Sequence, residues 1–230
     1  MPEGSRFYYL KNFPIFDGLD DETIHAIDNA LAVRQHRKND YVHLPGERGN
    51  VLNFIKEGHV KISRLTPDGR EMILDIVGPG ELLGELTLMD EHREYNEVAQ
   101  ALDTVTICSV HRQDFEHLIN TYPELNAQLA RRLSLRLRKI EERMSDLLFK
   151  NVRKRIASFL VRHTEQFGTV KKQMIYLRPY LSHQDIALIT GSTRQTVTTT
   201  LNEFRTAGII DFSRKEFMIN DYNRLKQLAS

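Results

Sequence analysis

The feature that most constrains the fold is a long run without helix-breaking residues. From Pro123 the sequence "PELNAQLARRLSLRLRKIEERMSDLLF" continues to Phe149 without another glycine or proline, which predicts one long helix over 123–149. Along it, apolar residues recur at spacings of four, three, four and three, which is a heptad seam: Leu133, Leu137, Ile140, Met144 and Leu147. Charged residues flank this seam, which favours a partner helix and a homodimer over a helix packed only on its own domain.

The chain before this helix has the turn sequences that are typical of an all-β domain. Nine of the twelve glycines lie in the first 84 residues, and from about residue 40 to 111 short apolar stretches alternate with turn sequences such as "PDG" and "GPG". This spacing predicts a compact β-barrel or roll, with helical patterns on either side of it. We therefore expect an α+β chain in three parts: a β-roll sensor domain (1–122), a long dimerisation helix (123–150) and a C-terminal domain (151–230).

Charge is distributed unevenly between these parts. Residues 151–230 hold 13 Lys and Arg against six Asp and Glu, whereas residues 1–150 hold 19 against 25. A basic C-terminal part joined to an acidic remainder suggests that the C-terminal part binds a polyanion.

Other classes of protein are excluded by composition. No apolar run approaches the roughly 20 residues that span a bilayer, and the N-terminus lacks a signal-peptide core, so we expect a cytoplasmic protein with no membrane partner. The single cysteine, Cys108, excludes an internal disulfide and an all-cysteine metal or iron–sulfur site within one chain. The sequence contains no P-loop, nucleophile elbow or HExxH motif, so we expect no enzyme, no catalytic residues and no metal site.

The stretch "LSHQDIALITGSTRQTVTTTLNEFRTAGII" (181–210) predicts two short helices joined by a turn at Gly191. Ser182 with Asp185 forms a capping box for the first helix, and Ser192 with Gln195 forms one for the second. Apolar residues at helical spacing supply a shared core: Ile186, Ile189, Val197, Leu201 and Phe204. Two helices joined in this way are a helix-turn-helix.

With these positions turned inward, the second helix presents a polar face. Its side chains suit the base edges of a DNA major groove, so the base-reading candidates are Arg194, Gln195, Thr198 and Thr199. Helix N-termini and nearby hydroxyls bind phosphates, so the positioning candidates are Ser182, His183, Gln184, Thr193 and Thr196. The segment "GIIDFSRKEFMI" that follows indicates a two-stranded wing with Arg214 and Lys215 at its tip. This surface predicts binding to double-stranded DNA.

Over nearly its full length the chain resembles the CRP/FNR family of bacterial transcription regulators. The resemblance is carried by the long helix, by "SHQDIALITGSTRQTVTTTL", by "GPGELLGELTLM" (78–89), and by the turn glycines Gly46, Gly58 and Gly69. It implies a cyclic-nucleotide-binding-type β-roll, a homodimer along the long helix and a winged helix-turn-helix. Such a dimer binds a two-fold symmetric operator, with its recognition helices about 34 Å apart. The resemblance also implies an activator that contacts RNA polymerase, with a repressor as the alternative. The loop 66–71 and the segment 164–173 are candidate exposed contacts for it, with ordinary loops as the alternative.

The effector site departs from the cyclic-AMP-binding members of this family. In those members a Gly-Glu pair begins the phosphate cassette and an Arg-Ser pair ends it. Gly84 and Glu85 match the first pair and precede Leu86, but the ungapped match to the second pair is Tyr95 and Asn96. The nearest base is Arg93, two residues early. A buried phosphate without a cationic partner costs several kcal/mol, on the order of the cost of burying an unpaired charge.

The long helix departs as well. Adenine-binding members present a Thr-Ser pair there, whereas the ungapped match here is Ile140 and Glu141, and one helical turn earlier it is Arg136 and Leu137. We therefore do not expect cyclic AMP as the effector. The alternatives are an unknown small molecule, no effector, haem bound by one of the nine histidines, or cyclic AMP with Arg93 shifted into the phosphate site.

The base-reading face also differs from the family pattern. Relatives that read a TGTGA-type half-site use an Arg-Glu pair and a later Arg, whereas here Gln195 and Thr199 accompany Arg194. Gln prefers adenine where Glu accepts from cytosine, so the half-site should differ. A competing function is a cyclic-nucleotide sensor that acts through protein contacts alone. Such a sensor would not need Arg194, Gln195 or a basic wing.

Overall fold

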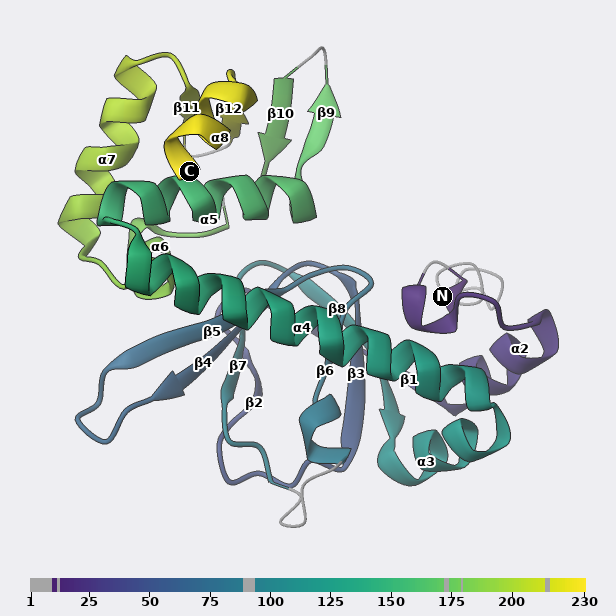
Figure 1. Cartoon of the computed structure of the whole chain (residues 1–230). Coiled ribbons are helices and arrows are strands. Elements are labelled where there is room, and N and C mark those ends of the chain that lie inside the picture. The colour runs from purple at the N-terminus through teal and green to yellow at the C-terminus, as the bar shows by residue number, and fades with distance from the viewer. Residues whose placement is uncertain (1–9, 12, 89–93, 172–173, 179, 214–215) are drawn as a thin grey trace. The chain divides into compact units, whose positions relative to one another are not determined.

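The computed structural model describes residues 10–11, 13–88, 94–171, 174–178, 180–213 and 216–230 (Figure 1). The chain forms two compact units, one that ends at Arg138 and one made mainly of residues 139–230. The described elements include both helices and strands, so the predicted α+β class is confirmed. The predicted domain boundaries at 122/123 and 150/151 stay predictions.

The first unit contains the predicted β-roll. Its eight strands form two four-stranded sheets, in the orders β1-β8-β3-β6 and β2-β7-β4-β5. The strands are β1 (Leu31–His36), β2 (Tyr41–His43), β3 (Val51–Glu57), β4 (Val60–Leu65), β5 (Glu71–Val77), β6 (Leu82–Leu83), β7 (Val98–Ala101) and β8 (Val105–His111). A core cluster joins the two sheets, with Ile55 and Ile107 contributed by the first and Ile62 and Ala99 by the second.

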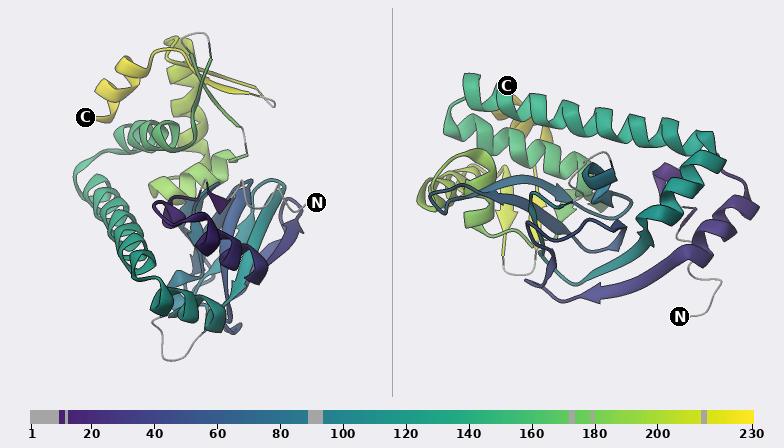
Figure 2. Two further views of the ribbon diagram at one scale, coloured as in Figure 1. Left: turned by 90° about the vertical axis from the view of Figure 1, so that its right-hand side faces the viewer. Right: turned by 90° about the horizontal axis from the view of Figure 1, so that it is seen from below.

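Helices cover the other face of the first sheet. They are η1 (Pro14–Phe16), α2 (Asp21–Ala30), α3 (Arg112–Thr121) and the start of α4 (Pro123–Phe149). Strand β3 is buried on both faces because successive side chains alternate: Phe54 packs in the helical cluster, whereas Ile55 packs between the sheets. Leu125 and Leu129 of α4 join the helical cluster. The bounds of α4 match the predicted long helix, and Figures 1 and 2 show α2 and α3 beside its first turns.

Two aromatic rings fill the interior of the roll beside the predicted effector site. The ring of His43, on β2, stacks on that of Tyr95 with centroids 3.6 Å apart and planes 1° from parallel. The Tyr95 hydroxyl donates a hydrogen bond to the Val51 carbonyl oxygen at 3.1 Å. Burial lowers the pKa of His43 to about 4. Within the described residues neither ring nitrogen of His43 has a hydrogen-bond partner, so the ring is neutral at neutral pH.

The second unit contains four further helices and a sheet. The helices are α5 (Val152–Phe167), α6 (His183–Thr190), α7 (Arg194–Thr206) and α8 (Tyr222–Ala229). The sheet has the order β11-β12-β10-β9, built from β9 (Thr169–Lys171), β10 (Met174–Leu177), β11 (Ile210–Phe212) and β12 (Phe217–Ile219). The predicted wing is therefore half of a four-stranded sheet. The alternative of an ordinary loop over 164–173 is wrong for the described part of that segment, because residues 164–167 end α5 and residues 169–171 form β9.

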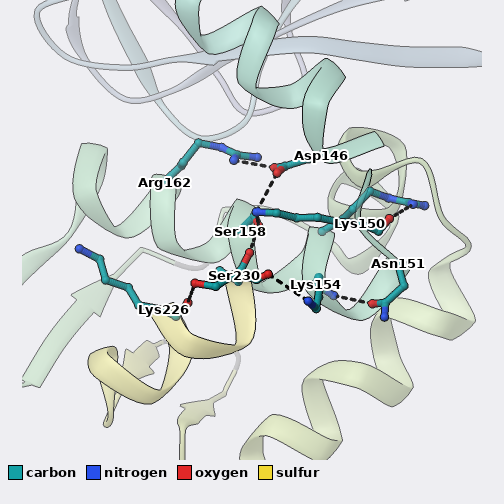
Figure 3. Close-up of polar contacts among 10 residues, drawn as sticks. Asp146, Lys150, Asn151, Lys154, Ser158, Arg162, Lys226 and Ser230 are labelled. Carbon is teal, nitrogen blue, oxygen red and sulfur yellow. Dashed lines mark hydrogen bonds and ion pairs between the residues drawn. The ribbon is translucent and has the colours of Figure 1, made fainter. Parts of the chain in front are cut away.

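A cluster of ion pairs joins the end of α4 to α5. The Asp146 carboxylate is buried between two cations, with Lys150 Nζ at 2.9 Å and Arg162 Nη1 at 2.6 Å (Figure 3). The Lys150 ammonium also donates to Ser158 Oγ at 2.9 Å, and Ser158 Oγ donates to the Ala229 carbonyl of α8 at 3.1 Å. One buried acid thus ties the last turns of α4 to the helix on which the rest of this unit packs.

Arg155 of α5 makes a second connection. Its guanidinium donates to three backbone carbonyls: Thr190 at 2.8 Å, Lys150 at 2.9 Å and Gly191 at 3.0 Å. The first and third belong to the turn between α6 and α7, and the second follows α4. A planar guanidinium presents a rigid set of donors, so this one side chain fixes the turn and the α4–α5 junction together.

We predict that Arg155→Met lowers the free energy of unfolding by about 2 kcal/mol or more, because three carbonyls lose a charged donor. Chemical denaturation measures this loss. Lys154→Met is the matched control, since the exposed Lys154 ammonium makes one surface hydrogen bond, to the Ser230 carbonyl. Equal stability of the two variants would contradict the structural role of Arg155.

We also predict a pH-dependent loss of stability from His43. The unfolded chain protonates this histidine below about pH 6.5, whereas the folded chain holds it neutral until about pH 4, so acid favours unfolding between these values. The full contribution is about 3 kcal/mol. His43→Phe keeps a ring against Tyr95 and removes the titration. The free energy of unfolding of this variant should therefore fall less steeply than that of the wild type between pH 6.5 and 4, and identical slopes would refute the burial argument.

Candidate nucleic-acid interface and effector site

The helix-turn-helix is built from α6, a glycine turn and α7. Ser182 caps α6, and the predicted capping box with Asp185 is confirmed. Gly191 ends α6 in the left-handed region, at φ 60° and ψ 48°. The Ser192 N–H then donates to the Ala187 carbonyl at 2.9 Å, which is the bond pattern of a Schellman turn.

The predicted cap of α7 is wrong by one residue. The cap is Thr193, whose hydroxyl oxygen accepts from the Thr196 N–H at 3.1 Å. The hydroxyl of Ser192 instead lies 3.0 Å from that of Thr190. The reason is local: the Schellman turn takes up both Gly191 and Ser192, so the next residue has to serve as the cap.

The underside of α7 is buried, as the apolar spacing predicts. Val197, Leu201 and Phe204 are each 0% exposed. From α6, Ile186 and Ala187 are also buried, whereas Ile189 is only half-buried. These contacts fix the rotation of α7 about its axis and therefore determine which of its side chains reach solvent.

The predicted base-reading residues divide into two groups. The side chains of Arg194, Gln195 and Thr199 are exposed at the start of α7. Thr198 is half-buried, and its hydroxyl donates to the Arg194 carbonyl at 2.9 Å and lies 2.8 Å from Nδ1 of His183. A hydroxyl engaged twice retains little capacity to bind a base, so Thr198 joins α7 to α6 instead.

The predicted phosphate-binding residues are similarly divided. Gln184 is exposed, and Ser182 is exposed with its hydroxyl bonded to Asp185 Oδ2 at 2.6 Å. Thr193 and Thr196 bond to each other through their hydroxyls at 2.9 Å. Arg214 and Lys215 lie outside the described residues.

His183 is half-buried at the start of α6. Burial, and then the nearby Arg194 guanidinium, lower the pKa of His183. A neutral imidazole would bind phosphate through a hydrogen bond only, without a charge.

Two arginines outside the predicted site residues also contact elements of this surface. The Arg153 guanidinium of α5 pairs with the Glu203 carboxylate of α7. The Arg205 guanidinium, in the last turn of α7, lies over the ring of Phe212 in β11, 4.9 Å from its centroid. Residue spacing carries no signal for either contact, because each joins side chains whose elements meet only in the folded unit.

The residues predicted for the effector site lie in the roll. Gly84 has φ +92°, and a Cβ atom there would lie 3.1 Å from the Val51 carbonyl oxygen and 3.4 Å from the Tyr95 ring. Glu85 follows at the start of the short 3-10 helix η2 (Glu85–Leu88) and is buried. The structure therefore brings Gly84, Glu85 and Tyr95 together, while Asn96 is exposed. Arg93 and the side chain of Leu86 lie outside the described residues.

The α4 residue that contacts Glu85 is Arg136, through an ion pair and a hydrogen bond. Ile140 and Glu141, the ungapped matches to the adenine-binding hydroxyl pair, have exposed side chains in the chain as described. The contact to Glu85 is therefore made by Arg136, the residue given by the alignment shifted one helical turn earlier, and not by the ungapped matches.

Among the described residues, no helix combines the length and apolar character needed to cross a membrane. Nor do three or more of their His, Cys, Asp or Glu side chains cluster as metal ligands would.

Comparison with known proteins assigns a domain family to each of the two units. The cyclic nucleotide-binding domain family matches residues 33–122, and the Crp-like helix-turn-helix domain family matches residues 154–228. The CRP-like cAMP-activated global transcriptional regulator of Mycobacterium tuberculosis is 33% identical over 94% of this chain and 96% of its own length. The cyclic AMP receptor protein of Thermus thermophilus is 28% identical over 96% of this chain and 98% of its own.

Solved structures agree on the fold. FixK2 from Bradyrhizobium japonicum superposes with a TM-score of 0.77 at 22% identity, covering 87% of this chain and 98% of that one. A CRP-family transcriptional regulator from Thermus thermophilus gives 0.71 at 27% identity, with 85% and 96% covered. The β-roll, the long helix and the C-terminal helix-turn-helix thus occur together in these relatives, and the chain belongs to the CRP/FNR family of transcription regulators, with a DNA-binding helix-turn-helix.

Proposed function

We propose that this regulator binds a two-fold symmetric operator as a homodimer and reads its sequence with the start of α7. The observation that carries the proposal is the contrast between the two faces of this helix. Val197, Leu201 and Phe204 are fully buried, whereas Gln195 and Thr199 are exposed on the opposite side and Arg194 is exposed at the start of the helix. In a helix-turn-helix, the recognition helix packs on the domain through its apolar face, and its exposed polar N-terminal turn enters the major groove.

The exposed residues suggest which bases are read. Arg pairs with the O6 and N7 acceptors of guanine, Gln pairs with the N6 and N7 edge of adenine, and the Thr methyl packs on thymine. Because Gln195 and Thr199 replace charged residues of the TGTGA-type readers, the preferred half-site differs from that sequence at two positions. The exposed Gln184 and the N-terminal turn of α6 then contact the phosphates that fix the register.

Arg194→Ala tests the reading role. We expect a loss of about 1–3 kcal/mol in specific binding and a relaxed preference for one guanine, because a bidentate contact to one base disappears. Fluorescence anisotropy with the selected operator and with random duplex measures both affinities. Arg131→Ala, an exposed change on α4, is the matched control. Equal losses on operator and random DNA would show that Arg194 contacts only phosphates.

The homodimer is supported by an apolar stripe along α4. Leu137, Ile140, Met144 and Leu147 are between 44% and 57% exposed in the single chain, and Leu148 extends the stripe at 73%. Leu133, the first residue of the predicted seam, is half-buried and packs on the helical core of its own unit. A row of exposed large apolar side chains marks an interaction surface, and the heptad spacing fits a second copy of the same helix.

We predict that Met144→Glu separates the dimer. A charge placed in the apolar seam should cost about 2–4 kcal/mol and raise the dissociation constant on the order of 100-fold. Sedimentation equilibrium measures the change. Leu135→Glu is the matched control: Leu135 is also exposed, but it lies nine residues, or about 2.5 turns, from Met144 and therefore on the opposite face of the helix. Dissociation by the control alone would place the interface elsewhere.

We further propose that cyclic AMP is not the effector, although the Mycobacterium tuberculosis relative is described as cAMP-activated. The proposal is supported by Tyr95, whose ring packs against Gly84 where a phosphate would approach the backbone. We also propose that the protein activates transcription by contacting RNA polymerase, as the family resemblance implies.

The alternative is a sensor that acts through protein contacts alone. Retention of DNA binding at low salt, with an affinity that falls as salt rises, would exclude it, because phosphate contacts release counterions. Failure to bind any duplex at low salt would favour it over the proposed function.

A further inference from the structure

We propose that the second unit contains a ligand site of its own: a cavity between α5, α6 and the wing strands β11 and β12 takes a small aromatic carboxylate, and the bound anion weakens binding to DNA. The effect on DNA rests on the proposed function, whereas binding of the ligand does not. The residues that line this cavity all belong to the second unit.

The cavity has a volume of about 90 Å³. Its inner lining is part of the core, since Leu160 of α5, Leu177 of β10 and Ile186 of α6 are buried. Arg178 and Ser213 are exposed, so the cavity opens to solvent beside them. A closed apolar cavity of about 150 Å³ takes up a whole benzene molecule. This smaller, open cavity therefore admits a single ring partway and leaves its polar substituent at the opening.

Aromatic rings form much of the lining. Phe212 and Phe217 of the wing stack on each other with centroids 5.8 Å apart, and the His183 ring meets Phe212 edge to face at 5.9 Å. From α5, Phe159 and His163 form a second stacked pair, with centroids 5.2 Å apart. A further ring packs favourably on such a lining in offset or edge-to-face geometry. The cavity therefore favours an aromatic group over an aliphatic one.

The opening of the cavity is positively charged. The exposed Arg178 guanidinium has no hydrogen-bond or ion-pair partner among the described residues. No acidic side chain occurs among the described residues that line the cavity. A guanidinium binds a carboxylate through a planar fork of donors, so a ring that carries a carboxylate matches both the lining and the opening.

The cavity also adjoins the proposed DNA-binding surface. His183, which lines it, begins α6, and its Nδ1 atom lies 2.8 Å from Thr198 Oγ1 on α7. A carboxylate bound at Arg178 places a negative charge near the start of α6, where the proposed phosphate contacts are made. This charge repels the DNA backbone and neutralises one nearby cation, so the bound ligand lowers the affinity for DNA.

Benzoate is the probe for this site, and benzamide is its neutral match. In NMR of the full chain, benzoate should bind with a dissociation constant in the millimolar range, as expected for so small a ligand. The chemical-shift changes should concentrate in α6 and the wing strands. Benzamide should bind about 3-fold or more weakly, because it loses the charged contact to an exposed guanidinium. Cyclohexanecarboxylate, which keeps the charge and lacks the aromatic face, should also bind more weakly.

Three results of this titration would overturn the proposal. They are no binding of benzoate at about 10 mM, shift changes confined to the β-roll, and equal binding of the three probes.

Two cavity variants test the position of the ligand. Arg178→Gln should weaken benzoate binding about 3-fold or more and leave benzamide binding unchanged, since it removes only the charged contact. Leu181→Phe adds bulk to a half-buried side chain of the lining and should weaken the binding of both probes. Lys154→Gln, which removes an exposed cation of α5 outside the lining, is the matched control. Equal benzoate binding by the wild type and both cavity variants would place the ligand elsewhere and refute the proposal.

The effect on DNA is measured by fluorescence anisotropy at fixed ionic strength, with sodium chloride replacing sodium benzoate as the salt-matched control. Saturating benzoate should weaken operator binding by the wild type about 3-fold or more, and Arg178→Gln should be less sensitive to it. Operator affinity that does not change at saturating benzoate would overturn the proposal.

These outcomes are distinct from failure of the proposed function. If the wild type binds no duplex, the proposed function fails while the NMR titrations still test the cavity. If the wild type binds its operator but not benzoate, the proposed function stands and the inference fails.

Discussion

The burial of one face of α7 is the interaction on which the other features of the DNA-binding unit depend. Val197, Leu201 and Phe204 have no solvent exposure, and their packing stabilises a helix that its own sequence favours poorly. Threonines lose rotamer freedom in a helix, yet α7 contains four of them between Thr196 and Thr200. Tertiary packing outweighs this local cost, so polar residues can occupy the outer face.

The second unit contains both the proposed recognition helix α7 and part of the proposed dimer seam. Ile140, Met144 and Leu147 of the proposed seam belong to the compact unit that contains α7. Asp146 and Arg155 bind the end of α4, α5 and the α6–α7 turn to one another. A two-fold axis along the seam would therefore carry both recognition helices as parts of one rigid arrangement. The spacing of the half-sites would follow from contacts that lie within each chain.

Local patterns predicted the parts of this structure that depend on local chemistry. The bounds of α4 follow from the absence of glycine and proline, and the capping box at Ser182 follows from a four-residue motif. The cap of α7 is Thr193 and not the predicted Ser192, because the Schellman turn at Gly191 includes Ser192. Strands β9 and β10 and helix α8 are short, so their periodicity is too brief to separate them from loops.

Contacts between distant segments could not be predicted in this way. The pairing of Arg136 with Glu85 joins residues 51 positions apart. The sequence allows two alignments of the long helix that differ by one turn, and only the fold, which places Arg136 beside the roll, decides between them. The engagement of Thr198 by His183 is similar, since a helical wheel places Thr198 beside the exposed residues. The residue types of a site can thus be predicted from sequence, whereas its pairings depend on the fold.

The most direct measurement is selection of bound sites from random DNA duplexes by the purified chain without any nucleotide. We expect enrichment of an inverted repeat whose half-sites are centred about 10 base pairs apart, because in the proposed dimer each protomer would present one α7 to one major groove. Enrichment of a single unpaired half-site, or no enrichment until a cyclic nucleotide is added, would contradict it.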